Sequence, residues 1–291
     1  MEITELLKKK GFVITAELGP PKGTNLEPFF KQAGYLKNRV DAANVTDSQA
    51  ALMKLGSVAA CHLLKDFGIE PIMQITCRDK NRIAIQSELL SASVLGIQNV
   101  LVLTGDPISI GDHPSAKPVF DLDAAELMSV IKKLENGSDM TGHALDGPPK
   151  FAIGAALNPC VEDLDTEMAK TKKKIESGAG FFQTQGVFDL GRFKKFIERY
   201  KQEGFKTPIL AGIILLKSAK MANFMNEKIP GIFIPKELIA RLERSTDNKS
   251  ECAKIASETI RAIKPHVQGV HLMAIGWEEL VPEVLASSGL S

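Results

Sequence analysis

The chain alternates between short apolar segments and longer segments in which apolar residues have helical spacing. Eight segments are predicted to be strands, at 12–18, 41–46, 71–76, 99–104, 151–157, 181–185, 208–214 and 269–275. Most of them are continuously apolar rather than alternating, which is typical of a parallel sheet covered on both faces. This repeated alternation restricts the chain to the α/β folds.

Two architectures accommodate eight strand–helix repeats in 291 residues, a closed (β/α)8 barrel and a doubly wound open sheet. A doubly wound sheet usually carries a Gly-x-Gly-x-x-Gly turn or another phosphate loop, and the sequence has neither. We therefore predict a (β/α)8 TIM barrel, with residues 1–291 forming a single domain. The segment between the last two strands is longer than one helix needs, so an extra helix is expected before the last strand.

The charge balance argues against nucleic acid as a partner. Lys and Arg total 36 and Asp and Glu total 35, so the net charge is +1, whereas binding to nucleic acid needs a concentrated basic surface. The longest apolar run, 208–216, is far shorter than the ~20 residues that cross a bilayer. Residues 1–12 lack the apolar region of a signal peptide and are predicted to form a helix. We expect no nucleic-acid binding and no membrane insertion.

The cysteines and histidines predict neither a disulfide framework nor a metal site. No Cys-x-x-Cys pair occurs, and four widely separated cysteines suit reduced thiols, namely Cys61, Cys77, Cys160 and Cys252. The five histidines form no cluster with metal-binding spacing. We therefore predict a cytoplasmic protein without a bound metal.

Polar residues stand at the carboxyl ends of the predicted strands. They are Glu17, Thr46, Asp47, Gln74, Thr76, Asp106, Asn158, Thr184, Gln185, Lys217 and His271. A barrel brings these ends to one mouth, where their side chains line a single pocket. Asp47 and Asn158 also suit simple helix N-caps. Gln74 and Gln185 lie in otherwise apolar strands, where a buried amide needs hydrogen-bond partners that a ligand can supply.

Two carboxylates of this predicted pocket, Glu17 and Asp106, come from different strands and stand among neutral amides and hydroxyls. Such a set of donors and acceptors suits a heteroaromatic ligand, for example a flavin or a pterin. A carboxyl group that is desolvated in such a pocket has a raised pKa and is suited to general acid catalysis. The residues alone therefore predict a small-molecule enzyme of the barrel type, and they do not name its substrate.

Three ordered motifs resemble those of methylenetetrahydrofolate reductases: AELGPPKG at 16–23, LVLTGDP at 101–107 and KKKIESGAGFFQTQGVFD at 172–189. The resemblance covers nearly the whole chain and is to the short prokaryotic form of the family. It implies a (β/α)8 barrel that holds a flavin, which is FAD in most members. It also implies reduction of 5,10-methylenetetrahydrofolate to 5-methyltetrahydrofolate by hydride transfer from the reduced flavin, after protonation of a folate nitrogen opens the methylene bridge.

The resemblance implies roles for four residues near the folate. Glu17 matches the carboxylic acid proposed to protonate the folate nitrogen. Asp106 matches the aspartate beside both the flavin ring and the pterin. Gln185 matches the glutamine that binds the pterin, and Thr184 precedes it in the same motif.

The resemblance also implies a set of flavin-binding positions. They are Thr46, Gln74, Thr104, Gly105, Asp106, Ala156, Glu167 and Lys174. Within this set, Glu167 and Lys174 match an acidic–basic pair that contacts the ribityl, phosphate or adenosine portion. For Lys174 the alternative is that the sequence KTKKK forms only the solvated face of a helix.

Several positions depart from the family pattern. Thr104 stands where many members have arginine, Gln74 where many have histidine, and Leu157 where many have tyrosine. These differences weaken the expected contacts with the adenosine half of FAD, so FMN is the alternative cofactor. The segment LLKSAK at 215–220 lacks the phenylalanine that stacks on folate in some members, which leaves the stacking residue unassigned.

The same departures are typical of a divergent subgroup, such as that of acetogenic bacteria, in which the reductase works with a partner subunit and iron–sulfur carriers. The electron donor is therefore expected to be NAD(P)H or a partner electron-transfer subunit, and the protein to be an oligomer or part of a hetero-complex. Two other functions remain open: a flavin-free pterin-binding barrel that acts as a folate-dependent methyltransferase component, and a non-catalytic subunit of a redox complex.

Overall fold

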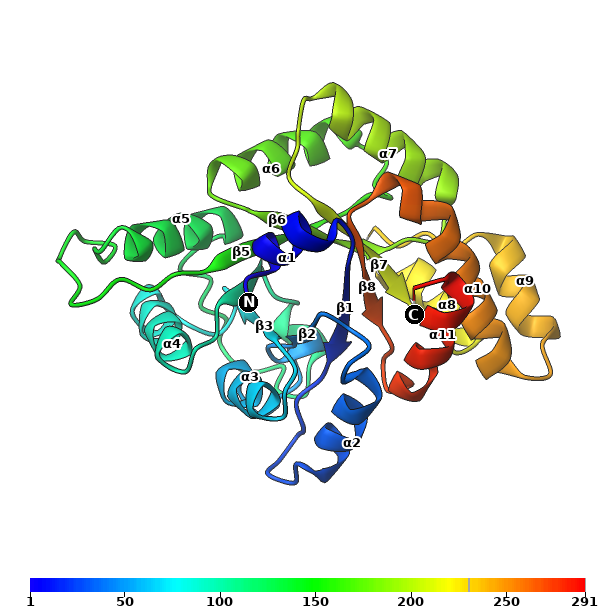
Figure 1. Ribbon diagram of the computed structural model, residues 1–291, viewed down its shortest axis with the longest axis horizontal. Helices are drawn as coiled ribbons and strands as arrows, with labels where there is room; N and C mark the ends of the chain where they lie inside the picture. The colour runs from blue at the N-terminus through cyan, green and yellow to red at the C-terminus, as the bar shows by residue number, and fades with distance from the viewer. Residues whose placement is uncertain (230, 291) are drawn as a thin grey trace.

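The computed structural model describes residues 1–229 and 231–290, and eight parallel strands form a closed barrel at its centre (Figure 1). The strands are β1 (Val13–Leu18), β2 (Ala42–Val45), β3 (Pro71–Thr76), β4 (Asn99–Leu103), β5 (Ala152–Leu157), β6 (Phe181–Gly186), β7 (Ile209–Ile214) and β8 (Gly269–Met273). Each pairs with the next along the chain, and β8 pairs with β1. The predicted (β/α)8 fold is confirmed, because every predicted strand is present with its ends displaced by at most two residues.

A ring of helices surrounds the barrel (Figure 1). Outside the β7–β8 connection it comprises α2 (Glu27–Leu36), α3 (Ser57–Asp66), α4 (Arg82–Val94), α5 (Ala124–Glu135), α6 (Leu164–Glu176), α7 (Leu190–Gln202) and α11 (Val281–Ser288). Short 3-10 turns are η1 (Gln49–Ala51), η2 (Ile108–Ile110), η3 (Lys264–His266) and η4 (Glu278–Leu280). Asp123, Asp163 and Asp189 start α5, α6 and α7 by accepting a backbone N–H of the first turn.

The connection between β7 and β8 contains more helix than we predicted. Its described residues form α8 (Ala219–Lys228), α9 (Lys236–Arg244) and α10 (Asn248–Ile263), so the predicted extra helix is present together with a further one. Two residues mark where the second and third of these helices begin. Pro235 precedes α9, and Asp247 caps α10 by accepting the backbone N–H groups of Lys249 and Ser250.

The predicted N-cap roles of Asp47 and Asn158 are wrong. The N-cap of α3 is Gly56 and that of α6 is Asp163, because several loop residues intervene between strand and helix. Asp47 instead accepts hydrogen bonds of 3.0 Å from both the backbone N–H and the hydroxyl of Thr76. Asn158 turns the chain after β5 by accepting the N–H of Cys160.

The amino-terminal end of the barrel is filled with apolar side chains. The predicted first helix is α1 (Ile3–Lys10), and it lies across the middle of the ring (Figure 1). Ile3 and Leu7 of α1 pack against the lower barrel interior, where Phe181 is completely buried. The N–H of Ile3 donates a 2.7 Å hydrogen bond to Oδ1 of Asn99 at the start of β4. Side chains of α1 and the lower barrel interior therefore close this end of the barrel.

Candidate functional site

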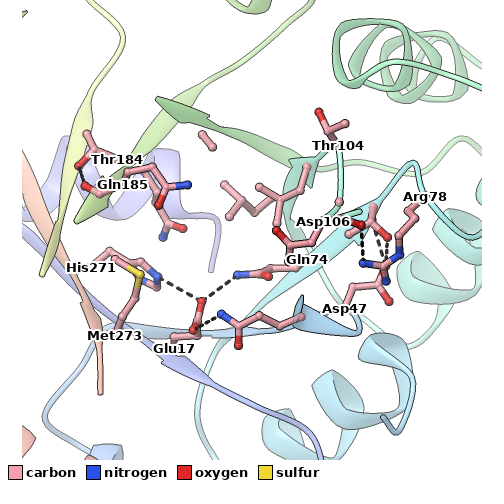
Figure 2. Close-up of a pocket in the computed structure, with 17 residues that line it drawn as sticks. Glu17, Asp47, Gln74, Arg78, Thr104, Asp106, Thr184, Gln185, His271 and Met273 are labelled. Atoms are coloured by element: carbon pink, nitrogen blue, oxygen red, sulfur yellow. Dashed lines mark hydrogen bonds and ion pairs between the residues drawn. The ribbon is translucent and has the colours of Figure 1, made fainter. Parts of the chain in front are cut away.

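A cavity of about 360 Å³ opens at the carboxyl ends of the strands (Figure 2). It is lined by Glu17, Asp47, Gln49, Gln74, Thr76, Arg78, Leu101, Leu103, Thr104, Gly105, Asp106, Ala156, Gln183, Thr184, Gln185, His271 and Met273. The predicted site residues among them are Glu17, Gln74, Thr104, Gly105, Asp106, Ala156, Thr184 and Gln185. Closure of the barrel thus brings together residues that are far apart in the sequence.

Glu17 lines this cavity from β1, with its side chain only 13% exposed (Figure 2). Its Oε1 accepts a 3.0 Å hydrogen bond from Gln49, and its Oε2 accepts one of 3.4 Å from Gln74. Burial raises the pKa of Glu17, and the two amide donors oppose that rise because they stabilise the carboxylate. The group can therefore hold a proton in a site that largely excludes water.

Asp106 lies on the opposite side of the cavity, after the tip of β4 (Figure 2). The preceding residue, Gly105, has a φ of 94°, and a Cβ there would lie 2.8 Å from Cβ of Arg78. Only glycine fits this turn. Oδ2 of Asp106 accepts a 2.8 Å hydrogen bond from the N–H of Ala50, and Arg78 donates to the Asp106 carbonyl at 3.4 Å. The carboxylate is thereby held at the cavity mouth.

Thr184 and Gln185 line the same cavity on β6, but their environments differ. The hydroxyl of Thr184 accepts the N–H of Gly212 at 2.9 Å and donates to the Gln185 carbonyl at 2.7 Å. It therefore joins β6 to β7 where their register shifts. Gln185 is exposed at the mouth, where its amide is accessible to a ligand.

Three predicted cofactor residues lie outside the cavity lining. Thr46, the residue directly after β2, is buried, and its N–H donates to the Leu18 carbonyl. Glu167 accepts the N–H of Asn158 at 2.9 Å, and Lys174 donates to the Ala156 carbonyl at 2.7 Å. Both side chains extend from α6 and hold the end of β5.

The pKa of Lys174 is lowered by its burial. A side chain that is buried in this way does not form the solvated helix face that the alternative interpretation of KTKKK required. Its contact with Ala156, which lines the cavity, makes its effect on the site indirect in this structure.

The sequence analysis missed several residues that shape the site. Gln49 and Arg78 extend from loops after β2 and β3 and bind Glu17 and the Asp106 backbone, respectively. Deeper in the barrel lie Thr15, Asn44 and Gln183, all completely or almost completely buried. A signal for this deeper layer exists in the sequence, because Thr15 precedes Glu17 by two residues and Gln183 precedes Gln185 by two, and residues two apart share one face of a strand.

Three buried cysteines are unsuited to thiolate chemistry. Burial raises the pKa of Cys77 and Cys252 to about 12 and that of Cys160 to about 11, so none is a ready thiolate nucleophile. Residues 1–229 and 231–290 contain no group of three His, Cys, Asp or Glu side chains able to hold a metal ion. Over the same residues, no helix has the length and apolarity to cross a membrane.

Solved structures with a similar fold include an uncharacterized protein from Clostridium thermocellum that binds two copies of 5-methyl-5,6,7,8-tetrahydrofolic acid. It is 18% identical, has a TM-score of 0.63, and the match covers 98% of this chain and 97% of that one. A 2,3-dimethylmalate lyase matches with a TM-score of 0.51 and 10% identity, over 98% of this chain and 85% of that one. At these identities the similarity establishes the barrel fold.

The sequence relatives include several proteins named methylenetetrahydrofolate reductase. Methylenetetrahydrofolate reductase (NADH) 1 from Arabidopsis thaliana is 29% identical over 234 residues, which are 76% of this chain and 38% of that protein. The 5,10-methylenetetrahydrofolate reductase of Pectobacterium carotovorum is 25% identical over 167 residues, which are 56% of this chain and 51% of that protein. This chain therefore spans well under two thirds of the length of either relative.

The sequence profile of one family matches the chain almost from end to end, over residues 2–289. The motifs that carry the resemblance contribute Glu17, Asp106 and Gln185 to one cavity. The chain belongs to the methylenetetrahydrofolate reductase family.

Proposed function

We propose that this protein reduces 5,10-methylenetetrahydrofolate to 5-methyltetrahydrofolate with a bound flavin as the hydride donor. The observation that carries the proposal is the position of a buried acid, Glu17, in the same cavity as Asp106 and Gln185. Family membership over residues 2–289 and the names of the relatives support the same activity. The Clostridium protein of similar fold binds the methylated product, which supports a folate ligand for this barrel.

The cavity residues fit a flavin. Leu101, Leu103 and Ala156 provide an apolar wall for a flat ring, and Gly105 leaves the backbone beside it without a side chain. Gln74 and Thr104 supply polar groups that suit the ring's heteroatoms. When bound there, the flavin supplies the hydride. FAD is the cofactor proposed from the family pattern, and FMN is the alternative because Thr104 and Gln74 replace the usual arginine and histidine.

The chain's own contribution to the reaction is to deliver a proton and to hold the substrate. Opening the methylene bridge requires protonation of the departing folate nitrogen, and we assign that proton to the Glu17 carboxyl. Its buried position favours the protonated acid in the absence of substrate. One proton from Glu17 and one hydride would together account for the methyl group of the product.

We assign substrate positioning to Asp106 and Gln185, whose side chains stand at the mouth on the β4 and β6 sides of the cavity. An amide can both donate to and accept from the edge of a pterin, and a carboxylate can accept from its N–H groups. We further propose a cytoplasmic enzyme, working as an oligomer or in a hetero-complex, whose electrons come from NAD(P)H or a partner electron-transfer subunit.

The deciding experiment uses the purified full chain under anaerobic conditions. Its absorbance spectrum, followed by release of the chromophore, identifies FAD or FMN. Photoreduced protein is then mixed with 5,10-methylenetetrahydrofolate, and we expect the flavin to be reoxidised as 5-methyltetrahydrofolate forms. A reduced flavin that the substrate leaves unchanged overturns the proposal. A colourless protein that still binds folate favours the flavin-free methyltransferase component instead.

A further inference from the structure

A connected layer of polar side chains crosses the barrel interior at the base of the cavity, which two of its members, Gln183 and His271, also line. It consists of Asn44 on β2, Gln183 on β6, Thr15 on β1 and His271 on β8, each no more than 3% exposed. Such a layer is costly inside an apolar barrel unless every member is hydrogen-bonded. The proposed reaction, in which Glu17 supplies the proton and Asp106 and Gln185 hold the substrate, uses none of these four residues.

Two side-chain amides begin the chain of hydrogen bonds. Asn44 donates to Oε1 of Gln183 at 2.7 Å, and Gln183 donates back to Oδ1 of Asn44 at 3.0 Å. The same Gln183 nitrogen donates to the Thr15 hydroxyl oxygen at 3.2 Å. The reciprocal pair therefore orients the Gln183 amide so that its N–H group faces Thr15.

The Thr15 hydroxyl connects the Gln183 amide to the imidazole of His271. Its oxygen accepts from Gln183 and lies 3.0 Å from Nδ1 of His271 and 3.4 Å from the Val270 carbonyl oxygen. We assign the hydroxyl proton to the shorter contact, with Nδ1 as its acceptor. Nδ1 is then unprotonated, so the ring proton of the neutral imidazole is on Nε2. Burial supports the neutral form because it lowers the pKa of His271 to about 3.

Nε2 of His271 lies 4.0 Å from Oε2 of Glu17 (Figure 2). This distance is too long for a hydrogen bond, but catalytic hydrogen bonds are often long without substrate and shorten in the complex. A neutral N–H donor stabilises a carboxylate without adding a positive charge to the site. Two other carboxyl groups, Asp106 and Glu278, raise the pKa of Glu17 by charge repulsion, so they oppose formation of the Glu17 carboxylate.

We propose that His271, oriented by Thr15 and Gln183, is a positioning residue that directs Glu17 and stabilises its carboxylate after the proton has been given to the folate. The inference rests on the proposed function, because it concerns the proton step of that reaction. It predicts a defect confined to the folate half of the catalytic cycle. A histidine that merely filled the barrel would affect folding and both halves alike.

The test uses two matched pairs of variants in the flavin-loaded full chain. His271→Leu removes the donor, whereas His271→Gln returns an N–H group near the position of Nε2. Thr15→Val removes the hydroxyl at nearly constant volume, and Thr15→Ser retains it. We expect His271→Leu and Thr15→Val to slow reoxidation of the reduced flavin by methylenetetrahydrofolate about tenfold or more. His271→Gln and Thr15→Ser should stay within about threefold of the wild type, and all four should retain substrate affinity and flavin reduction by the donor.

The outcomes separate the inference from the function on which it rests. If the wild-type protein is reoxidised and His271→Leu is equally fast, the positioning role is overturned and the proposed function stands. If the wild-type protein is not reoxidised, the proposed function fails. Independently of activity, ¹⁵N NMR of the imidazole should report a proton on Nε2 of His271, and a proton on Nδ1 would overturn the inference. The Thr15 variants test the same chain of hydrogen bonds to His271. The proposal therefore stays falsifiable even if a His271 variant fails to fold.

Discussion

The side-chain amide of Gln49 donates a 3.0 Å hydrogen bond to Oε1 of Glu17, and the next residue, Ala50, donates its backbone N–H to Oδ2 of Asp106. One turn of the β2–α3 loop thus contacts two of the carboxylates that line the cavity, Glu17 and Asp106. The turn is conformationally demanding, because Ser48, Ala50 and Ala51 all have positive φ angles. Its contacts must hold it in place, and a ligand that reaches the carboxylates has to compete with them.

Replacing Gln49 should shift the pH dependence of the folate step. Gln49 donates to the charged form of Glu17 and so lowers its pKa. In Gln49→Ala the pKa of Glu17 should rise, the acid should remain protonated to higher pH, and the alkaline limb of kcat/KM should move to higher pH. Stopped-flow reoxidation across a pH series measures this shift, with Gln202→Ala at the exposed end of α7 as the control. If the alkaline limb of the pH profile does not move in Gln49→Ala, the Gln49 hydrogen bond does not act on the proton donor.

Replacing Glu17 by glutamine should separate the two halves of the reaction. The amide keeps the size of the side chain but cannot supply the proton, so reoxidation by methylenetetrahydrofolate should fall by about a hundredfold or more. Flavin content and flavin reduction by the donor should be unchanged. Glu176→Gln, on the exposed end of α6, provides the matched control. Full folate turnover in Glu17→Gln would mean that the acid is another group.

Lys174→Met tests whether α6 contributes to cofactor binding. If Lys174 has the role that the family pattern implies, its loss should weaken flavin binding by about tenfold, or about 1.4 kcal/mol. Equilibrium titration of the apoprotein with FAD and with FMN measures the change. Lys172→Met is the control, because Lys172 lies on the same helix with its side chain exposed. Unchanged affinity for both flavins would restrict Lys174 to holding the Ala156 carbonyl at the end of β5.

Acid should destabilise the folded protein through His271. The pKa of His271 is about 3 in the folded protein, compared with an ordinary value of 6.5. Between these two pH values, the unfolded chain binds a proton at this residue and the native state does not. The free energy of unfolding should therefore fall as the pH drops from 6.5 towards 3, by up to about 1.4 kcal/mol per pH unit.

Urea unfolding of wild type and His271→Gln across this pH range isolates the effect. The stability difference should move in favour of the variant as the pH falls, because glutamine does not titrate. His143→Gln, at a side chain that is 82% exposed, is the control. Stability curves for wild type and His271→Gln that stay parallel at all pH values would contradict the prediction.

Gly154→Ala should destabilise the barrel. A Cβ at Gly154 on β5 would overlap the ring of Phe181, which is fully buried in the barrel interior. Overpacking of this kind costs about 1–3 kcal/mol. Gly34→Ala is the matched control, because a Cβ there meets nothing within 4 Å and alanine favours the α2 helix by about 0.5–1 kcal/mol. Chemical denaturation should show opposite changes, and a neutral Gly154→Ala would show that Phe181 can move.

The local pattern of apolar and polar residues was sufficient to predict the strands and many of the residues that line the cavity. Glu17, Gln74, Asp106 and Gln185 were expected at strand ends and do line one cavity, because parallel strands in a barrel all end at the same mouth. Asp47 and Asn158 were misjudged as helix caps. A cap depends on where the helix begins, and the intervening loop residues carry no periodic signal that fixes that point.

The sequence by itself determined that this chain forms eight strand–helix units with polar tips, since apolar periodicity is a property of neighbouring residues. Only the tertiary structure decided that His271 faces Glu17 and that Gln49 donates a hydrogen bond to the same carboxylate. The physical reason is barrel closure: β8 pairs with β1 and places His271 beside Thr15, although the two are 256 positions apart. Contacts across such a separation depend on the register of the whole sheet, which no local stretch of sequence specifies.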